Sequence, residues 1–194
     1  MLRAFAVLFL ALASVWHSGP LRAASGTRTD ADSSSTVPDS IYQPRNLEGV
    51  RADEAPTIDG FLDEAVWASA PVAQRFTTAR PDPGQRPYLP TEIRVLYDDN
   101  ALYIGAHLID PHPDSIEVTL TERDEEGNAD WFGIVLCPYQ DGQNGVAFLL
   151  TAAGVQIDDK WTGNSRDRNF DAVWNSAVRV GENGWYAEVE IPYG

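Results

Sequence analysis

Apolar and polar residues alternate with a period of two, rather than 3.6, along most of the chain beyond residue 90. Such a period predicts β-strands that bury one face. The clearest case is 93–108, where an alternating strand leads into a turn at 98–101, and the return strand has one apolar face; the apolar positions are Ile93, Val95, Tyr97, Leu102, Ile104, Ala106 and Leu108. We therefore expect a β-hairpin in this stretch.

A second hairpin is expected near the end of the chain. Alternating residues at 174–180 lead into a turn at 181–184, and a second alternating run returns at 185–191. In this run Trp185 falls on the apolar face, whereas Glu188 and Glu190 fall on the face that should meet solvent. Trp174 and Trp185 are therefore predicted to lie in a core.

Shorter segments complete the predicted set of about eight strands. Alternation at 116–120 predicts a strand, the run 131–137 is apolar on both faces as in a central strand, and 146–151 and 155–158 follow. The polar stretch 159–171 is predicted to be a long functional loop. One short helix is expected at 62–68, with Trp67 in the core, Asp59 as its cap, and Asp63 and Glu64 in its first turn. The pattern favours an all-β fold, an antiparallel β-sandwich of jelly-roll or immunoglobulin-like type with one short helix near its N-terminus.

The first 45 residues differ in composition from the rest. Residues 1–24 place Arg3 before an apolar run that ends at Trp16, with small residues around Leu21–Ala24, which is the order of a secretory signal peptide. An uncleaved anchor is the alternative, but the run is shorter than the ~20 residues of a membrane-spanning helix. Residues 25–45 are rich in Ser, Thr, Asp and Pro and predict a disordered linker. The sequence therefore predicts export (to the periplasm, the outer membrane or the medium) of a folded domain at 46–194.

The formal charge of the chain is −15, from 14 basic and 29 acidic residues. Removal of residues 1–24 deletes Arg3 and Arg22 and leaves 12 basic residues and a net charge of −17. Such a charge repels nucleic acid, so we expect no nucleic-acid partner. The acids suit a well-solvated exported domain and offer oxygen ligands for Ca²⁺.

No pattern in the chain predicts catalysis. The sequence has no Ser-His-Asp elbow, HExxH motif or P-loop, and only His107 and His112 follow the predicted signal peptide. Paired carboxylates would suit a glycoside hydrolase, but 29 acids make some pair inevitable. We expect no catalytic residue and no enzyme activity in this domain.

Two blocks of sequence resemble the opening of a family 9 carbohydrate-binding module. The first is Ile-Asp-Gly-x-Leu-Asp-Glu-x-x-Trp at 58–67, and the second is the hairpin at 91–109; Asp110-Pro111, Asp130 before an apolar strand, and Gly-Trp-Tyr-Ala-Glu at 184–188 follow in the same order. The resemblance covers about 47–193 and implies a β-sandwich that holds sugars without cutting them.

The chain resembles one bacterial subset of these modules more closely. Arg123-Asp124 with Asp130, the run 154–158 and Ile-Pro-Tyr at 191–193 are similar to exported proteins whose family 9-like N-terminal domain precedes a larger domain resembling an outer-membrane β-barrel. We therefore expect residues 46–194 to be a module truncated at its C-terminus, from a protein in which a covalently linked barrel-like domain follows. In characterised family 9 modules two Trp faces enclose a sugar. The stretch 125–129, where one of them would lie, has no aromatic residue, and the other would lie beyond the end of this chain.

The residues that we predict to bind a ligand are Trp161, Arg123, Asp124, Asp130 and Trp131. An indole in a polar segment can stack on a sugar, and an arginine with acids can bond its hydroxyls. The alternatives are an Arg–Asp pair that only fixes the loop, and a Trp131 that packs in the core. The resemblance implies no required cofactor; it allows a structural Ca²⁺, for which Asp98, Asp99 and Asn100 are the candidates, with turn chemistry as the alternative.

The function predicted from these observations is non-catalytic carbohydrate binding by an exported module, in the service of polysaccharide breakdown. The partner would be a glycan chain or chain end. One alternative is a structural or interaction domain of an outer-membrane barrel-like protein without a sugar site. Another is the accessory domain of a glycoside hydrolase whose catalytic part lies outside this chain.

Overall fold

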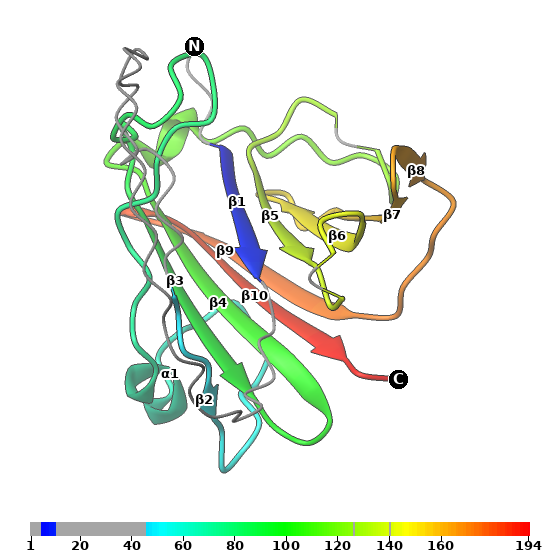
Figure 1. Ribbon diagram of the computed structural model, residues 1–194. Coiled ribbons are helices and arrows are strands. Elements are labelled where there is room, and N and C mark those ends of the chain that lie inside the picture. The colour runs from blue at the N-terminus through cyan, green and yellow to red at the C-terminus, as the bar shows by residue number, and fades with distance from the viewer. Residues whose placement is uncertain (1–4, 11–45, 126, 140) are drawn as a thin grey trace, which may run out of the picture. The chain divides into compact units, whose positions relative to one another are not determined.

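The computed structural model describes residues 5–10, 46–125, 127–139 and 141–194, with the side chains of 5–10 left out. The predicted linker at 25–45 and most of the predicted signal peptide lie outside these residues. The described part contains ten strands, a short helix α1 (Ala65–Ser69) and a 3₁₀ turn η1 (Pro113–Ser115). Figure 1 labels the strands and α1.

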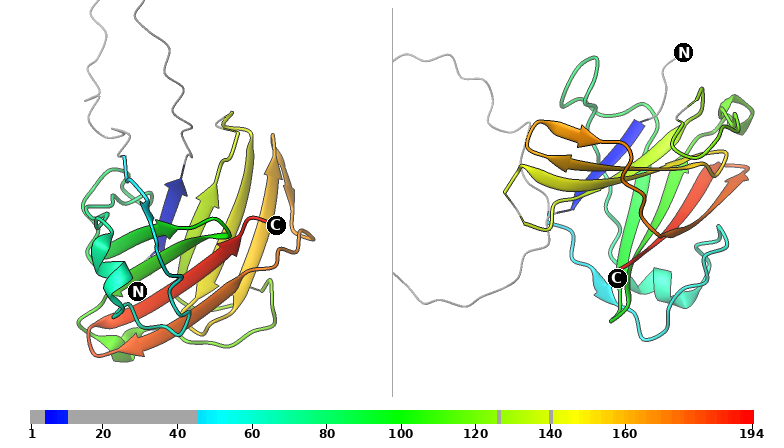
Figure 2. Two further views of the ribbon diagram at one scale, coloured as in Figure 1. Left: turned by 90° about the horizontal axis from the view of Figure 1, so that it is seen from below. Right: turned by 90° about the vertical axis from the view of Figure 1, so that its right-hand side faces the viewer.

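The strands form two sheets of five. The first sheet has the order β1 (Phe5–Leu10), β5 (Trp131–Leu136), β6 (Asn144–Thr151), β7 (Gln156–Thr162) and β8 (Ser165–Asp167). The second has the order β2 (Val50–Arg51), β3 (Thr91–Tyr97), β4 (Ala101–Ile109), β10 (Gly184–Pro192) and β9 (Asn175–Gly181). Pairing is antiparallel except at β1–β5 and β2–β3. The two sheets can be followed as separate layers in Figure 2.

One hydrophobic cluster joins the inner faces of both sheets. It includes Ile104 of β4, Phe132 of β5, Phe148 of β6 and Trp185 of β10, together with Trp174 just before β9. Phe148 and Trp174 meet edge to face, with ring centroids 5.4 Å apart. The predicted sandwich and the two predicted hairpins are confirmed, and so is the burial of Trp67, Trp174 and Trp185.

The outer face of the second sheet is covered by the segment that carries the first sequence block. Trp67 of α1 packs with Leu96 and Tyr103 in a second buried cluster. Beneath them lies Gly105, where a Cβ would be 2.6 Å from Leu62 Cδ2 and 3.1 Å from the Trp67 ring. Only a glycine leaves room for this approach. As a result β4 is buried on both faces, which alternation alone does not reveal.

The covering segment is attached to β10 by one buried carboxylate. Glu188 Oε2 accepts hydrogen bonds from the backbone N–H groups of Asp59 (2.9 Å) and Gly60 (2.6 Å). Glu188 Oε1 accepts one from Trp67 Nε1 at 2.9 Å. Burial raises the pKa of Glu188, although these donors act against the shift. The prediction that Glu188 faces solvent was wrong, since the side chain is fully buried under residues 59–67.

Other predictions of local structure were also wrong. Residues 116–120 form no strand, because this connection has no partner beyond an isolated bridge between Val118 and Ala129, and Val118 and Leu120 are exposed. The helix is shorter than predicted and its N-cap is Glu64, without a side-chain hydrogen bond. Asp59 instead caps its own turn, accepting from Phe61 N at 3.0 Å.

Residues 159–171 are not one long loop. Strand β7 continues to Thr162, and a turn at Gly163, with φ of +59°, returns the chain as β8. Apart from the buried Asp159, both strands are polar and exposed here, so no apolar alternation marked them.

Candidate functional site

A cluster of polar residues lies where the segment 121–125 meets the start of β7. Asp124 has φ of +67°, a conformation that Asp tolerates better than most residues. Its backbone N–H donates to the Gln156 carbonyl at 3.1 Å, and its carboxylate accepts from Asp158 N at 3.3 Å. The segment therefore hydrogen-bonds to β7 through Asp124, and this contact places Arg123 over the strand.

Arg123 is surrounded by acceptors. Its guanidinium donates to Gln156 Oε1 at 2.5 Å and to Asp158 Oδ1 at 2.6 Å, and it reaches the Ala172 carbonyl at 3.1 Å. Asp171 Oδ1 lies 3.2 Å away and Asp124 3.9 Å away. These contacts correspond to the alternative in which arginine fixes the loop. The ligand-binding role of Arg123 and Asp124 remains a prediction.

Asp158 is the centre of this cluster and is fully buried. Paired with Phe148 of β6, it points into the core. Besides Arg123, it accepts from Ala172 N at 2.7 Å and from Trp174 Nε1 at 3.1 Å. A buried carboxylate requires such partners. The result is a fixed position for Trp174 and for the start of β9.

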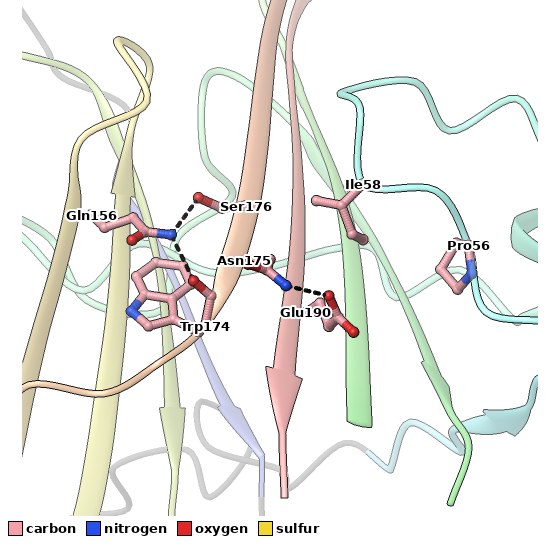
Figure 3. A pocket seen from close by; sticks show the side chains of 7 residues that line it. All are labelled: Pro56, Ile58, Gln156, Trp174, Asn175, Ser176 and Glu190. Carbon is pink, nitrogen blue, oxygen red and sulfur yellow. Dashed lines mark hydrogen bonds between the residues drawn. The ribbon is translucent and has the colours of Figure 1, made fainter. Parts of the chain in front are cut away.

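An open groove of about 550 Å³ adjoins the cluster. Figure 3 shows Gln156 and Trp174 on one side, Pro56 and Ile58 on the other, and Asn175, Ser176 and Glu190 between them. Gln156 Nε2 donates to the Trp174 carbonyl (3.2 Å) and to Ser176 Oγ (2.9 Å), and Asn175 Nδ2 donates to Glu190 Oε2 at 2.7 Å. The groove thus presents amide, hydroxyl and carboxylate groups in a fixed arrangement beside an apolar wall.

Trp161 lies apart from this cluster. It is on β7, not in a loop, and paired strand positions put Asp158 on the inner face and Trp161 on the outer face. The indole is 46% exposed, and the Arg166 guanidinium lies 5.9 Å from its ring centroid. Arg166 also forms an ion pair with the buried Asp159. The structure therefore does not bring Trp161 and Arg123 together on one surface.

Asp130 and Trp131 lie at the start of β5. The Asp130 backbone N–H donates to the Glu117 carbonyl at 3.0 Å, and its Oδ2 accepts from Glu117 N at 3.2 Å, so the residue holds the connection 116–130. Trp131 is half-buried on the outer face of the first sheet, with its ring over Gly133. Neither residue lines the groove.

The calcium candidates stabilise a turn. Asp98 Oδ1 accepts from Asn100 N and Ala101 N, and its Oδ2 accepts from the Tyr103 hydroxyl at 3.0 Å. The backbone donors keep the pKa of Asp98 low. Asp99 pairs with Arg51 at 2.5 Å. These contacts are those of turn chemistry, and in the described residues no three His, Cys, Asp or Glu side chains gather as metal ligands.

The groove residues Gln156, Asn175, Ser176 and Glu190 were not predicted. A signal for two of them was present, because a turn at 181–184 sets the register in which Asn175 faces Glu190. No sequence signal placed Gln156 beside Ser176, since the two belong to different sheets. In the part of the chain that the structure covers, no helix has the length and apolar character needed to cross a membrane.

The fold is shared with modules that bind sugars. A family 9 carbohydrate-binding module from Caldicellulosiruptor kristjanssonii in complex with glucose aligns with a TM-score of 0.52 and 15% sequence identity, over 76% of this chain and 70% of that one. A family 9 module from the same organism in complex with cellotriose aligns with a TM-score of 0.50 and 16% identity, over 75% of this chain and 67% of that one. No protein-family model and no curated protein matches the sequence. At such identities the likeness shows the fold, and it agrees with the sandwich predicted from the resemblance.

Proposed function

We propose that this chain is an exported, non-catalytic module that binds carbohydrate in the groove between Gln156 and Ile58. The observation that carries the proposal is the groove itself, a row of fixed polar side chains beside an apolar wall, in a fold shared with sugar-binding modules. The two similar structures are described as complexes with glucose and cellotriose, so glucose-based chains are the first ligands to test.

Sugars combine polar rims with apolar C–H faces, and the groove offers a partner for each. The Asn175 amide bonds Glu190 through one N–H and can offer its second N–H and its oxygen to hydroxyls, and the Glu190 carboxylate accepts only. Both N–H groups of Gln156 already bond Trp174 and Ser176, so its oxygen is the group open to a hydroxyl donor. Pro56 and Ile58 supply apolar contact on the opposite wall. Hydrogen bonds among the lining residues hold the polar groups in place before a ligand arrives, which lowers the entropic cost of binding.

The contacts of Arg123 support this assignment indirectly. Arg123 bonds Gln156 Oε1, which leaves the amide nitrogen directed toward Trp174 and Ser176 at the groove. We therefore propose that Arg123 is a positioning residue that orients Gln156. Direct contact between Arg123 and the sugar is not required.

A binding screen against soluble and insoluble glycans tests the proposal, with glucose and cellotriose as the first probes. Glu190→Gln removes the charge but keeps the shape. Hydrogen bonds to charged groups contribute about 1.5–3 kcal/mol, so we expect affinity to fall by roughly 10- to 100-fold. Glu182→Gln, an exposed residue in the turn of the same hairpin, makes the same change of charge and should leave affinity unaltered. Binding to no glycan, or equal binding by both variants, would overturn the proposal.

Trp161 is tested separately, because it lies on the other face of β7. If a sugar stacks on this indole, Trp161→Ala weakens binding and Glu190→Gln does not. The reverse result assigns the ligand to the groove.

A second candidate function is a structural or interaction domain without a sugar site. One observation favours it: Trp67, Trp174 and Trp185 are all packed in the interior, so only part of the aromatic surface that sugars stack on is exposed. A chain that binds no glycan but associates with a linked or neighbouring outer-membrane protein would fit this candidate.

A further inference from the structure

One side of β5 is covered only by the short strand β1. In the first sheet β5 has β6 on one side and β1 on the other, so without β1 it would be the edge strand. The six residues of β1 pair in parallel with β5, from Phe5 opposite Trp131 to Leu10 opposite Leu136, and Figure 1 shows the two strands side by side.

The sequence of β5 is that of an inner strand. It reads Trp-Phe-Gly-Ile-Val-Leu, with no charged residue, and Phe132 and Ile134 are buried in the core. Exposed edges with this composition promote pairing with other chains, and proteins normally protect them with charges, prolines or short strands.

The other three sheet edges in the described part of the chain have such protection. Strand β2 has two residues, and β8 has three residues that include Arg166 and Asp167. Strand β9 is longer but carries the exposed Arg179 and lies beside the segment with Pro56. Of these four edges, only that of β5 is protected solely by a partner strand. This indicates that β5 is suited to pairing with a strand on that side.

The present occupant falls within the predicted signal peptide. Strand β1 lies inside the apolar run of residues 1–24, so cleavage after Ala23 or Ala24 would remove it. We propose that in the exported protein the β5 edge is a strand-acceptor site, which binds an extended, apolar, uncharged segment of another polypeptide in parallel, as β1 does here. Main-chain hydrogen bonds give such strand addition its affinity. This inference rests on the predicted processing and not on the proposed sugar binding.

The test uses the protein as exported and purified, after N-terminal sequencing has established the cleavage site. A peptide with the sequence of residues 3–12 and a solubilising lysine tail is the probe, and amide hydrogen exchange of β5 is the readout. Alternate amides of β5 bond β6 and should be protected throughout. We expect the β5 amides that face away from β6 to exchange quickly in the protein alone and at least ten times more slowly with the peptide. The matched peptide with Val7→Pro should give no protection, because proline removes a ladder N–H.

Four results would overturn the inference. These are retention of residues 1–24 in the exported protein, protection in the processed monomer of the β5 amides that face away from β6, equal protection by both peptides, and no protection by either. Sedimentation analysis separates a further case. If the processed chain self-associates with β5 protected, the occupant is a second copy and the proposed partner segment is wrong.

Discussion

Replacement of Glu188 by alanine should destabilise the fold far more than removal of a surface acid. The carboxylate serves three donors, and two of these bonds, from Gly60 N and Trp67 Nε1, are buried. A buried donor that loses its partner costs about 1–3 kcal/mol, so Glu188→Ala should lower the free energy of unfolding by about 2–6 kcal/mol, partly relieved by the loss of a buried charge. This is a large share of the roughly 5–15 kcal/mol that stabilises a typical domain.

Urea denaturation followed by tryptophan fluorescence measures this effect, with the dependence on denaturant (m) as a check on two-state behaviour. The matched control is Glu182→Ala, an exposed residue of the same hairpin, which should stay within about 0.5 kcal/mol of the wild type. A Glu188→Ala protein within about 1 kcal/mol of the wild type, with unchanged m, would refute the idea that this carboxylate holds residues 59–67 on the sheet.

The pH dependence of folding stability provides an independent test of the environment of Glu188. Burial raises its pKa above the ordinary 4.5, so the folded chain keeps this proton to higher pH than the unfolded chain does. Its titration therefore favours folding below pH 4.5, and this contribution is lost as pH rises through the raised pKa. The stability of the wild type relative to Glu188→Gln should fall over that range, and a rise instead would contradict the assigned direction.

Three further predictions concern other parts of the fold. Arg123→Ala should cost about 2–4 kcal/mol in urea denaturation, less than for a fully buried pair because the arginine is 40% exposed, and adding Asp158→Asn should recover part of the loss. Gly105→Ala should cost about 1–3 kcal/mol by crowding Trp67, and Gly105→Val more; equal stability of the two would contradict the close approach. Desolvation lowers the pKa of His107 below 6.5, so stability should fall as pH drops through this range, and His107→Phe, which keeps the stack on Tyr186, should lose less.

The sequence predicted the hairpins because their signals are local. Alternation and turn residues at 91–109 and 174–191 set strand type, register and inner face together, and the structure has all three. The stretch 116–120 has the same alternation but no neighbouring strand, and alternation alone does not supply a partner. Strand β8, in contrast, is a real strand that the sequence did not predict, because an exposed polar strand has no apolar alternation.

The candidate site was only partly predictable. Positions 158 and 161 are three residues apart on one strand, so Asp158 and Trp161 point to opposite faces of the sheet. This follows from the sequence once residues 159–162 are known to be strand. The burial of Glu188 did not follow, because it depends on a segment about 120 residues earlier that folds over β10. The block at 58–67 and the motif at 184–188, two of the matches that carry the resemblance, meet at this carboxylate, so these two identify the fold rather than a ligand.

Chemical-shift mapping during titration with cellotriose tests the central claim most directly. We predict that the shifted resonances cluster on the groove, at the side-chain amides of Gln156 and Asn175 and the backbone of Glu190, and saturate with added ligand. Shifts confined to the surface around Trp161, or no shifts with any glycan that the binding screen selects, would contradict the assignment of carbohydrate binding to this groove.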